Sequence, residues 1–227
     1  MAAYKSIEQK RFEVLVIYIL MFFTIWTIRA MGIFEDVYSG NALLKSIIDN
    51  SIKYIVWTLP VFILLSFYYN ENPFSYLKLT DNVWKGVLWG IAVGALLVIY
   101  HIARSFIMGD GKFYLDIDIF TWIHRIILIG ITEEVVFRGF ILQKLTEEFE
   151  FIYANTISAV LFLLIHFPGW YADGLMTKDR MAYFLAGAVF VLVFGLLQGY
   201  VLKRTRSLWA CMIIHSMNNL ITTIVRI

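Results

Sequence analysis

The chain of 227 residues is 60% apolar and 16% charged, and its mean hydropathy is +0.75. Because a soluble globular domain is about half apolar and about a quarter charged, this composition predicts a polytopic membrane protein. The formal net charge of +2 is too small to indicate nucleic-acid binding, and the single cysteine, Cys211, excludes an internal disulfide and a cysteine-rich metal site.

Apolar stretches follow one another along the chain, and most approach the length of about 20 residues that a helix needs to cross the hydrocarbon core. The first begins after Lys10 and Arg11 and shows no small-residue cleavage site, so we expect it to remain as a membrane anchor. The stretches are about 12–28, 52–69, 86–103, 119–143, 151–167, 182–202 and 208–226. We predict an all-α polytopic helical bundle with about 7–8 transmembrane helices, in which residues 1–227 form a single membrane domain.

In the third stretch, Gly86, Gly90 and Gly94 recur at every fourth residue. This spacing places a glycine groove along one side of the helix and predicts close packing against another helix. Basic residues divide evenly between the two predicted sides of the membrane, so they do not set the orientation of the chain. We expect a multi-pass protein of the cell (plasma) membrane.

Three polar motifs interrupt the apolar stretches in the second half of the chain. They are Glu133-Glu134-Val135-Val136-Phe137-Arg138, Phe162-Leu163-Leu164-Ile165-His166 and His215-Ser216-Met217-Asn218-Asn219. Ionisable side chains are costly at membrane depth, so each motif is a candidate functional site. The alternative is that these groups hold helices together by hydrogen bonds or ion pairs.

The spacing of the first motif assigns different roles to its two glutamates. Residues four apart lie on nearly the same face of a helix, so Glu134 is placed to pair with Arg138. Glu133 points about 100° away from Glu134 and is predicted to be the carboxylate that accepts a proton from water. A buried charge cluster without catalytic function is the alternative.

The other two motifs also use the four-residue spacing. His215 and Asn219 share a face and could hydrogen-bond an oxyanion, or they could form an interhelical pair. Phe162 and His166 follow the same spacing, with Pro168 expected to end their helix. A single histidine at a helix end is more often a polar terminus than a catalyst, but these groups together on three apolar helices favour a catalytic site.

Motifs of other hydrolases are absent from the sequence. There is no His-Glu-x-x-His helix and no Gly-x-Ser-x-Gly turn. His101 and His124 lie near predicted membrane ends, where interfacial or capping roles are expected for them.

The order of the three motifs resembles the CPBP (CAAX protease and bacteriocin-processing, or Abi) family of intramembrane proteases, which includes the type II CAAX prenyl endopeptidases. The resemblance covers a core region of about residues 120–222, and its motif positions fall on separate predicted helices. These positions are Glu133, Glu134, Arg138, Phe162, His166, His215 and Asn219. The N-terminal hundred or so residues resemble the family only in their apolar helices.

The resemblance implies that Glu133 activates the attacking water with help from His166. It further implies that His215 and Asn219 stabilise the oxyanion, while Glu134 and Arg138, with Phe162, support the site. Metal-free catalysis is favoured, so no cofactor is expected; in the alternative, Glu133, His166 and His215 bind zinc with one open position.

Three functions are compatible with the sequence. The first is intramembrane cleavage of a peptide or membrane-protein substrate in the lipid bilayer, with no nucleic-acid partner. The second is a catalytically silent immunity or scaffold protein of the same fold. The third is a small transporter with Glu133 and His215 as a proton relay, which the lack of an internal repeat disfavours. Cleavage requires Glu133, His166, His215 and Asn219 to converge on one cavity, and we expect Glu134 to meet Arg138 on another side of its helix.

Overall fold

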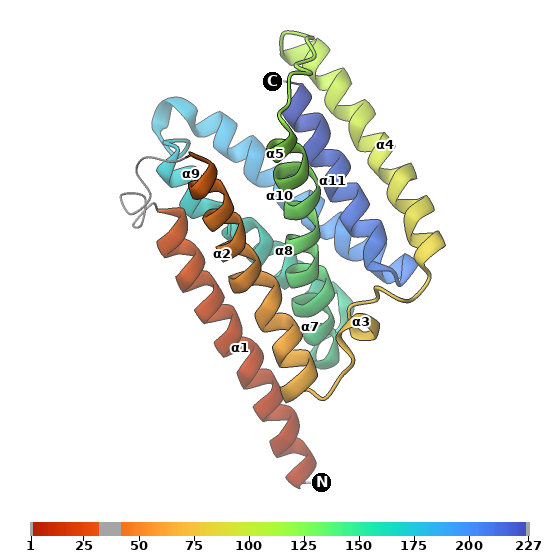
Figure 1. Ribbon diagram of the computed structural model, residues 1–227. Coiled ribbons are helices and arrows are strands. Elements are labelled where there is room, and N and C mark those ends of the chain that lie inside the picture. Colours follow the sequence, from red (N-terminus) through yellow and green to blue (C-terminus); the bar gives the residue numbers. More distant parts are fainter. Residues whose placement is uncertain (1, 32–41, 226–227) are drawn as a thin grey trace. The chain divides into compact units, whose positions relative to one another are not determined.

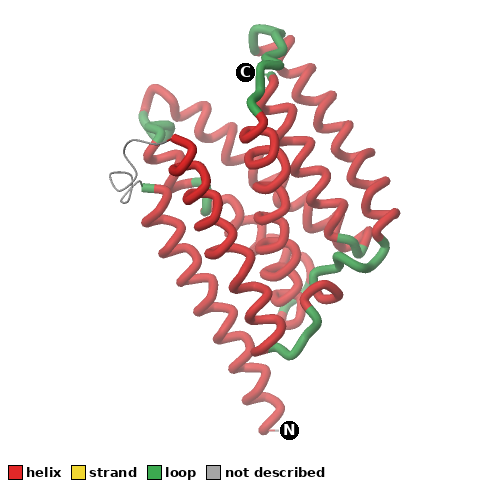
Figure 2. The backbone as a smooth tube through the Cα atoms, viewed as in Figure 1, coloured by secondary structure: helices red, strands yellow, loops and turns green. Residues whose placement is uncertain are grey.

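The computed structural model describes residues 2–31 and 42–225. Throughout these residues the regular structure is helical, and the only pairing of extended backbone among them is an isolated bridge between Phe113 and Val225 (Figure 2). Four described helical segments are long and apolar enough to cross a membrane, and shorter apolar helices accompany them. The four are Lys10–Ala30, Val83–Met108, Phe151–Ala172 and Lys178–Thr205. The predicted fold class, an all-α polytopic membrane protein, is confirmed.

Each predicted apolar stretch corresponds to one helix or to one run of consecutive helices (Figure 1). The α-helices are α1 (Ala2–Ala30), α2 (Ala42–Ile63), α3 (Pro73–Tyr76), α4 (Val83–Met108), α5 (Ile119–Thr121), α6 (Ile129–Glu134), α7 (Gln143–Glu148), α8 (Phe151–Leu164), α9 (Phe167–Ala172), α10 (Met181–Thr205) and α11 (Leu208–Ile224). Three π-helical segments, η2 (Leu64–Tyr68), η3 (Trp122–Leu128) and η4 (Val135–Leu142), and one 3-10 turn, η5 (Lys178–Arg180), complete the described elements.

The chain divides into two compact units. The first consists of Met1–Asn70 and Phe140–Leu197, and the second of Glu71–Gly139 and Gln198–Ile227. The boundary within the middle of the chain therefore falls inside η4. The single membrane domain expected from the sequence stays a prediction.

An aromatic core joins α1 and α2 in the first unit. The Trp57 ring is fully buried, with its centroid 4.8 Å from those of both Phe22 and Trp26. The Lys53 ammonium lies 4.5 Å from the centroid of the Trp57 ring, a distance at which a cation–π interaction is favourable. The Trp26 indole N–H donates a hydrogen bond of 2.9 Å to the Ile165 carbonyl, which connects α1 to the C-terminal end of α8.

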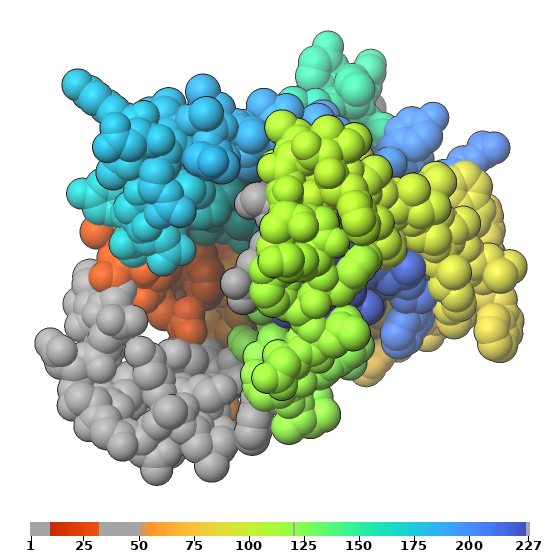
Figure 3. All heavy atoms as spheres, turned by 90° about the horizontal axis from the view of Figure 1, so that it is seen from above, coloured from red at the N-terminus to blue at the C-terminus, as the bar shows by residue number. Residues whose placement is uncertain are grey.

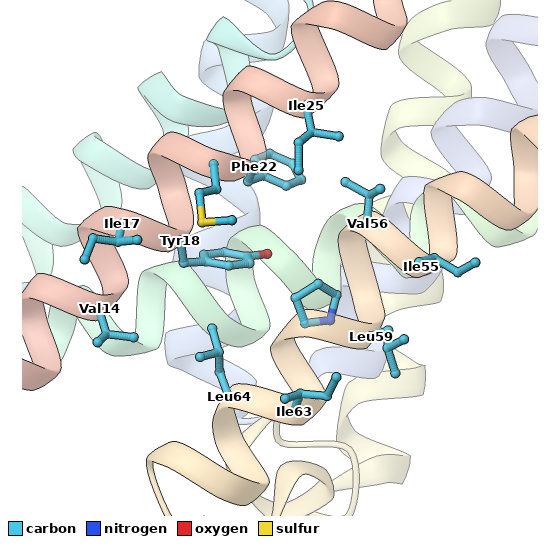
Figure 4. A pocket seen from close by; sticks show the side chains of 12 residues that line it. Val14, Ile17, Tyr18, Phe22, Ile25, Ile55, Val56, Leu59, Ile63 and Leu64 are labelled. Atoms are coloured by element: carbon cyan, nitrogen blue, oxygen red, sulfur yellow. The ribbon is translucent and has the colours of Figure 1, made fainter.

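A groove of about 410 Å³ lies between α1 and α2 of the same unit (Figure 4). Its walls are almost entirely apolar. The lining residues are Val14, Ile17, Tyr18, Met21, Phe22, Ile25, Ile55, Val56, Leu59, Pro60, Ile63 and Leu64. This surface suits contact with hydrocarbon.

In the second unit, α4 packs closely against α11 along its glycine face, as the spacing predicts. A Cβ atom on Gly90 would lie 2.8 Å from the Ile213 Cβ, and one on Gly94 would overlap the Met217 sulfur. Gly86 approaches the start of α11 in the same way. Since a side chain at these positions would require its neighbours to shift, the glycines set the short distance between the two helices.

Further contacts within the second unit fix both ends of α11. Near its start, the Gln198 amide donates to the Cys211 carbonyl at 3.0 Å, and the Cys211 thiol donates to the Gln198 carbonyl at 3.3 Å. At its other end, the Tyr114 N–H donates to the Ile224 carbonyl at 2.8 Å. Figure 3 shows the loop after α4 beside the end of α11. Helix α11 is thus the element on which the second unit is assembled.

Candidate active site

Glu134 forms the buried ion pair predicted by the four-residue spacing. Its Oε1 accepts a hydrogen bond of 3.2 Å from Nη1 of Arg138, and the side chains are 0% and 1% exposed. The predicted pairing of Glu134 with Arg138 is therefore confirmed. A pair buried to this extent neutralises a carboxylate and a guanidinium that would each be costly to bury alone.

The imidazole of His215 lies between the two adjacent glutamates. Its Nδ1–H donates to Oε1 of Glu134 at 2.7 Å, and its Nε2 lies 3.8 Å from Oε2 of Glu133. All three side chains are buried. We expected Glu134 to meet Arg138 on a side of the helix away from the proposed catalytic residues. This was wrong, because Oε1 of Glu134 accepts hydrogen bonds from both Arg138 and His215.

Geometry explains how neighbouring residues on one helix reach one ring. The two nitrogens of an imidazole lie on different edges of the ring. Two carboxylates about 100° apart around a helix can therefore each approach a different nitrogen. The backbones must also be close. Gly130, one turn before Glu134, permits this, because a Cβ at that position would lie 2.9 Å from Oγ of Ser216 and 3.4 Å from Cβ of His215.

The site glutamates occupy a short α-helical segment, α6, between the π-helical segments η3 and η4. A π-helical turn contains about one residue more than an α-helical turn and is often found beside functional sites. The backbone donors and acceptors in such turns are displaced from the α-helical pattern. The carbonyl of Arg125, in η3, accepts a hydrogen bond from the side chain of Asn219.

Asn219 points its side-chain amide at that carbonyl, donating to the Arg125 oxygen at 3.0 Å. An amide NH2 group has two hydrogens, so the second remains able to donate elsewhere. The preceding residue, Asn218, is the more buried of the two, and its Oδ1 accepts a hydrogen bond of 3.0 Å from Nε2 of His101. The interfacial or capping role expected for His101 was wrong, because its side chain is 2% exposed and bonds to α11.

His166 lies in the first unit, in the turn between α8 and α9. Its Nδ1–H donates to the Phe162 carbonyl at 2.8 Å, and the two rings meet edge to face with centroids 5.1 Å apart. Helix α8 ends at Leu164, and Pro168 lies in the first turn of α9, so this proline begins a helix instead of ending one. The convergence of His166 with Glu133, His215 and Asn219 stays a prediction.

The hydrogen bonds of both histidines bear on the zinc alternative. In His166 and His215 the Nδ1–H is donated to an oxygen, which leaves Nε2 as the nitrogen able to accept a proton or bind a metal. With Glu133 these nitrogens would make a donor set of the type that binds zinc. Over the described ranges, no three His, Cys, Asp or Glu side chains are grouped for metal binding.

Residues 116–221 match a family described as Type II CAAX prenyl endopeptidase Rce1-like. This range contains every position of the three motifs, from Glu133 to Asn219, whereas His101 lies outside it. Comparisons with curated proteins and with solved structures give no match. The resemblance of this membrane protein to the type II CAAX prenyl endopeptidases is thereby confirmed for residues 116–221, the part of the chain that carries all of its candidate catalytic residues.

Proposed function

We propose that the protein is an intramembrane endopeptidase that hydrolyses a peptide bond with a water molecule activated by Glu133. The observation that carries the proposal is the position of the His215 ring, bound to Glu134 through Nδ1 and close to Glu133 through Nε2. A structural ion pair between Glu134 and Arg138 needs neither this second carboxylate nor its placement beside Nε2 of an imidazole. A catalytic site needs both.

In the proposed reaction, Glu133 removes a proton from water, and the oxygen attacks the carbonyl carbon of the scissile bond. The oxyanion of the tetrahedral intermediate accepts hydrogen bonds from Nε2–H of protonated His215 and from the amide of Asn219. The bond to the amide nitrogen then breaks, and Glu133 returns the proton to the departing amine. Glu134 stabilises the His215 imidazolium through Nδ1 while Arg138 holds Glu134 in place.

His166 is proposed to assist Glu133 by accepting a hydrogen bond from the attacking water at Nε2. The bond from its Nδ1–H to the Phe162 carbonyl fixes the tautomer that this role requires. If zinc is bound, Glu133, His166 and His215 would hold it, and the metal would supply a water that ionises near neutral pH.

The proposed substrate is a peptide or membrane protein that reaches the site from the bilayer, and the proposed location is the plasma membrane. The family name points to prenylated CAAX peptides as the first substrates to test. A catalytically silent immunity or scaffold protein is the second candidate function, since buried charge pairs also occur without catalysis.

The test compares the substitutions Glu133→Gln and Glu134→Gln in protein reconstituted in lipid. Glu133→Gln should lower hydrolysis by at least about 100-fold while preserving the thermal unfolding temperature, because it removes the base and keeps the shape. Glu134→Gln should lower both activity and stability, because it weakens the contacts to Arg138 and His215.

Substrates for this comparison come from membranes of cells that express the wild-type or the Glu133→Gln protein. Peptides that accumulate only with the wild type are synthesised with and without a prenyl group and assayed with purified protein. Equal peptide profiles from the two strains, together with equal rates on CAAX peptides, would favour the scaffold over the protease. Full activity of Glu133→Gln with a stable but inactive Glu134→Gln would exchange the roles of the two glutamates.

A further inference from the structure

A buried polar pair connects α4 to α11 outside the set of proposed catalytic residues. Nε2 of His101 lies 3.0 Å from Oδ1 of Asn218, and the two residues are 2% and 8% exposed. A carbonyl oxygen only accepts hydrogen bonds, so Nε2 of His101 carries the proton and donates. Breaking such a bond in an apolar surrounding leaves a buried polar group without its partner, which is costly.

The position of Asn218 on α11 connects this pair to the site. Asn218 follows His215 by three residues, slightly less than one helical turn, and it directly precedes Asn219. Because the residues of a helix share one backbone, a bond that fixes the direction of Asn218 also fixes the directions of His215 and Asn219.

The remaining contacts of α4 with α11 set distance more than rotation. Gly86, Gly90 and Gly94 present backbone to α11 and allow close approach, but van der Waals contact with glycine has little directional preference. Of the described contacts between these two helices, the hydrogen bond of His101 is directional, since its strength falls steeply as the donor angle departs from linearity.

We infer that His101 is a positioning residue, which sets the rotation of α11 through Asn218 and thereby presents His215 to Glu133 and Glu134. Its effect on the rate of hydrolysis rests on the proposed function. Its effect on the geometry of His215 does not, so the two are measured separately.

Three substitutions separate positioning from simple packing. His101→Gln retains a donor N–H close to the position of Nε2, whereas His101→Leu removes the donor and strands Oδ1 of Asn218. The double substitution His101→Leu with Asn218→Leu removes both polar groups, so it should recover most of the stability lost in His101→Leu. Ser105→Ala is the matched control, because Ser105 is also buried in α4, one turn further along.

The first measurement is the nitrogen-15 spectrum of labelled histidine rings in protein reconstituted in lipid nanodiscs. The chain has four histidines, so the His215 signals can be assigned by substitution. They should shift in His101→Leu and in the double variant, and should keep the wild-type values in His101→Gln and Ser105→Ala. Unchanged His215 signals in both leucine variants would overturn the inference, whether or not the protein is a protease.

The second measurement is hydrolysis. In the double variant kcat should fall by at least about tenfold with KM nearly unchanged, since small misplacements of catalytic groups have large effects on rate. His101→Gln should restore kcat. A double variant with wild-type kcat, or a fall in kcat that Ser105→Ala reproduces at equal stability, would overturn positioning. Absence of any hydrolysis dependent on Glu133 would instead refute the proposed function and leave the spectrum to decide the role of His101.

Discussion

One carboxylate oxygen, Oε1 of Glu134, carries two roles in this protein. It accepts a hydrogen bond from Arg138 within its own helix and another from His215 on α11. The first bond is local and follows from residue spacing, whereas the second depends on how two helices pack. A change at Glu134 therefore affects both the stability of the unit and the orientation of the proposed catalytic imidazole.

Arg138→Met should destabilise the protein by about 3–5 kcal/mol, because it leaves the ionised Glu134 buried without its guanidinium partner. Adding Glu134→Gln to this variant should recover part of the loss, since the carboxylate that lost Arg138 is then replaced by a neutral amide. The measurement is unfolding of the purified variants in detergent. A loss in the double variant equal to the sum of the losses in Arg138→Met and Glu134→Gln would show that the two side chains contribute independently.

Whether the proposed hydrolysis requires a metal depends on the roles of Glu133 and of Nε2 in His166 and His215. If Glu133 alone activates the water, exhaustive chelation should leave the rate of hydrolysis within about twofold of the untreated rate, since proton transfer by a positioned base accounts for rate gains without a metal. Metal content of protein purified without added metal is measured in parallel. Stoichiometric zinc, with activity lost on chelation and restored by zinc, would contradict metal-free catalysis and assign Nε2 of His166 and His215 to metal binding.

Residue spacing predicted the contact of Glu134 with Arg138 within one helix, but it did not predict the hydrogen bonds of Glu134 and His101 to α11. The pairing of Glu134 with Arg138 followed from helical spacing alone, and the structure confirms it. The bond of Glu134 to His215 joins residues 81 positions apart, and that of His101 to Asn218 joins residues 117 apart. Such pairs depend on which helices are neighbours, and spacing along one helix carries no information about that.

At the scale of elements, the glycine spacing of α4 predicted a packing face without naming its partner. The structure identifies α11 as that partner, and it adds Gly130 as the small residue that brings α6 close to His215. The close packing at Gly130 could have been predicted from the sequence, because this glycine lies one turn before Glu134 in an apolar segment. The π-helical segments on either side of α6 were not predicted, since residue spacing was interpreted with α-helical turns throughout.

The glycine face gives a matched pair of substitutions. Gly90→Ala should destabilise the protein by about 1–3 kcal/mol, because its Cβ would meet the branched Cβ of Ile213 at 2.8 Å and the Ala210 carbonyl at 3.2 Å. Gly94→Ala should cost less, because the nearest atom is the sulfur of Met217, at the flexible end of its side chain. Unfolding measurements on both variants test the order, and a larger loss for Gly94→Ala would contradict it.

At the scale of the whole molecule, hydropathy predicted the helical class and the approximate places of the long helices, but not short helices such as α3. The long apolar stretches need only length and composition to be recognised, and the structure confirms the all-α class. The division into two compact units was not predicted, because it depends on contacts between residues far apart in sequence. His166 belongs to one unit and Glu133 to the other. The order of motifs in a sequence does not say which helices are neighbours, so the convergence of these two residues stays a prediction.

The helices that carry the site also have a consequence for biogenesis. Neither the segment with Glu133, Glu134 and Arg138 nor α11 is among the four described segments that are long and apolar enough to cross a membrane. A single charged residue at the centre of an inserting helix costs about 2.5–3.5 kcal/mol. Glu134 and Arg138 lie four residues apart on one helix, whereas His215 is synthesised about 80 residues later. The arrangement of Glu133 and Glu134 around His215 is therefore complete only after α11 has been synthesised and has packed against α6.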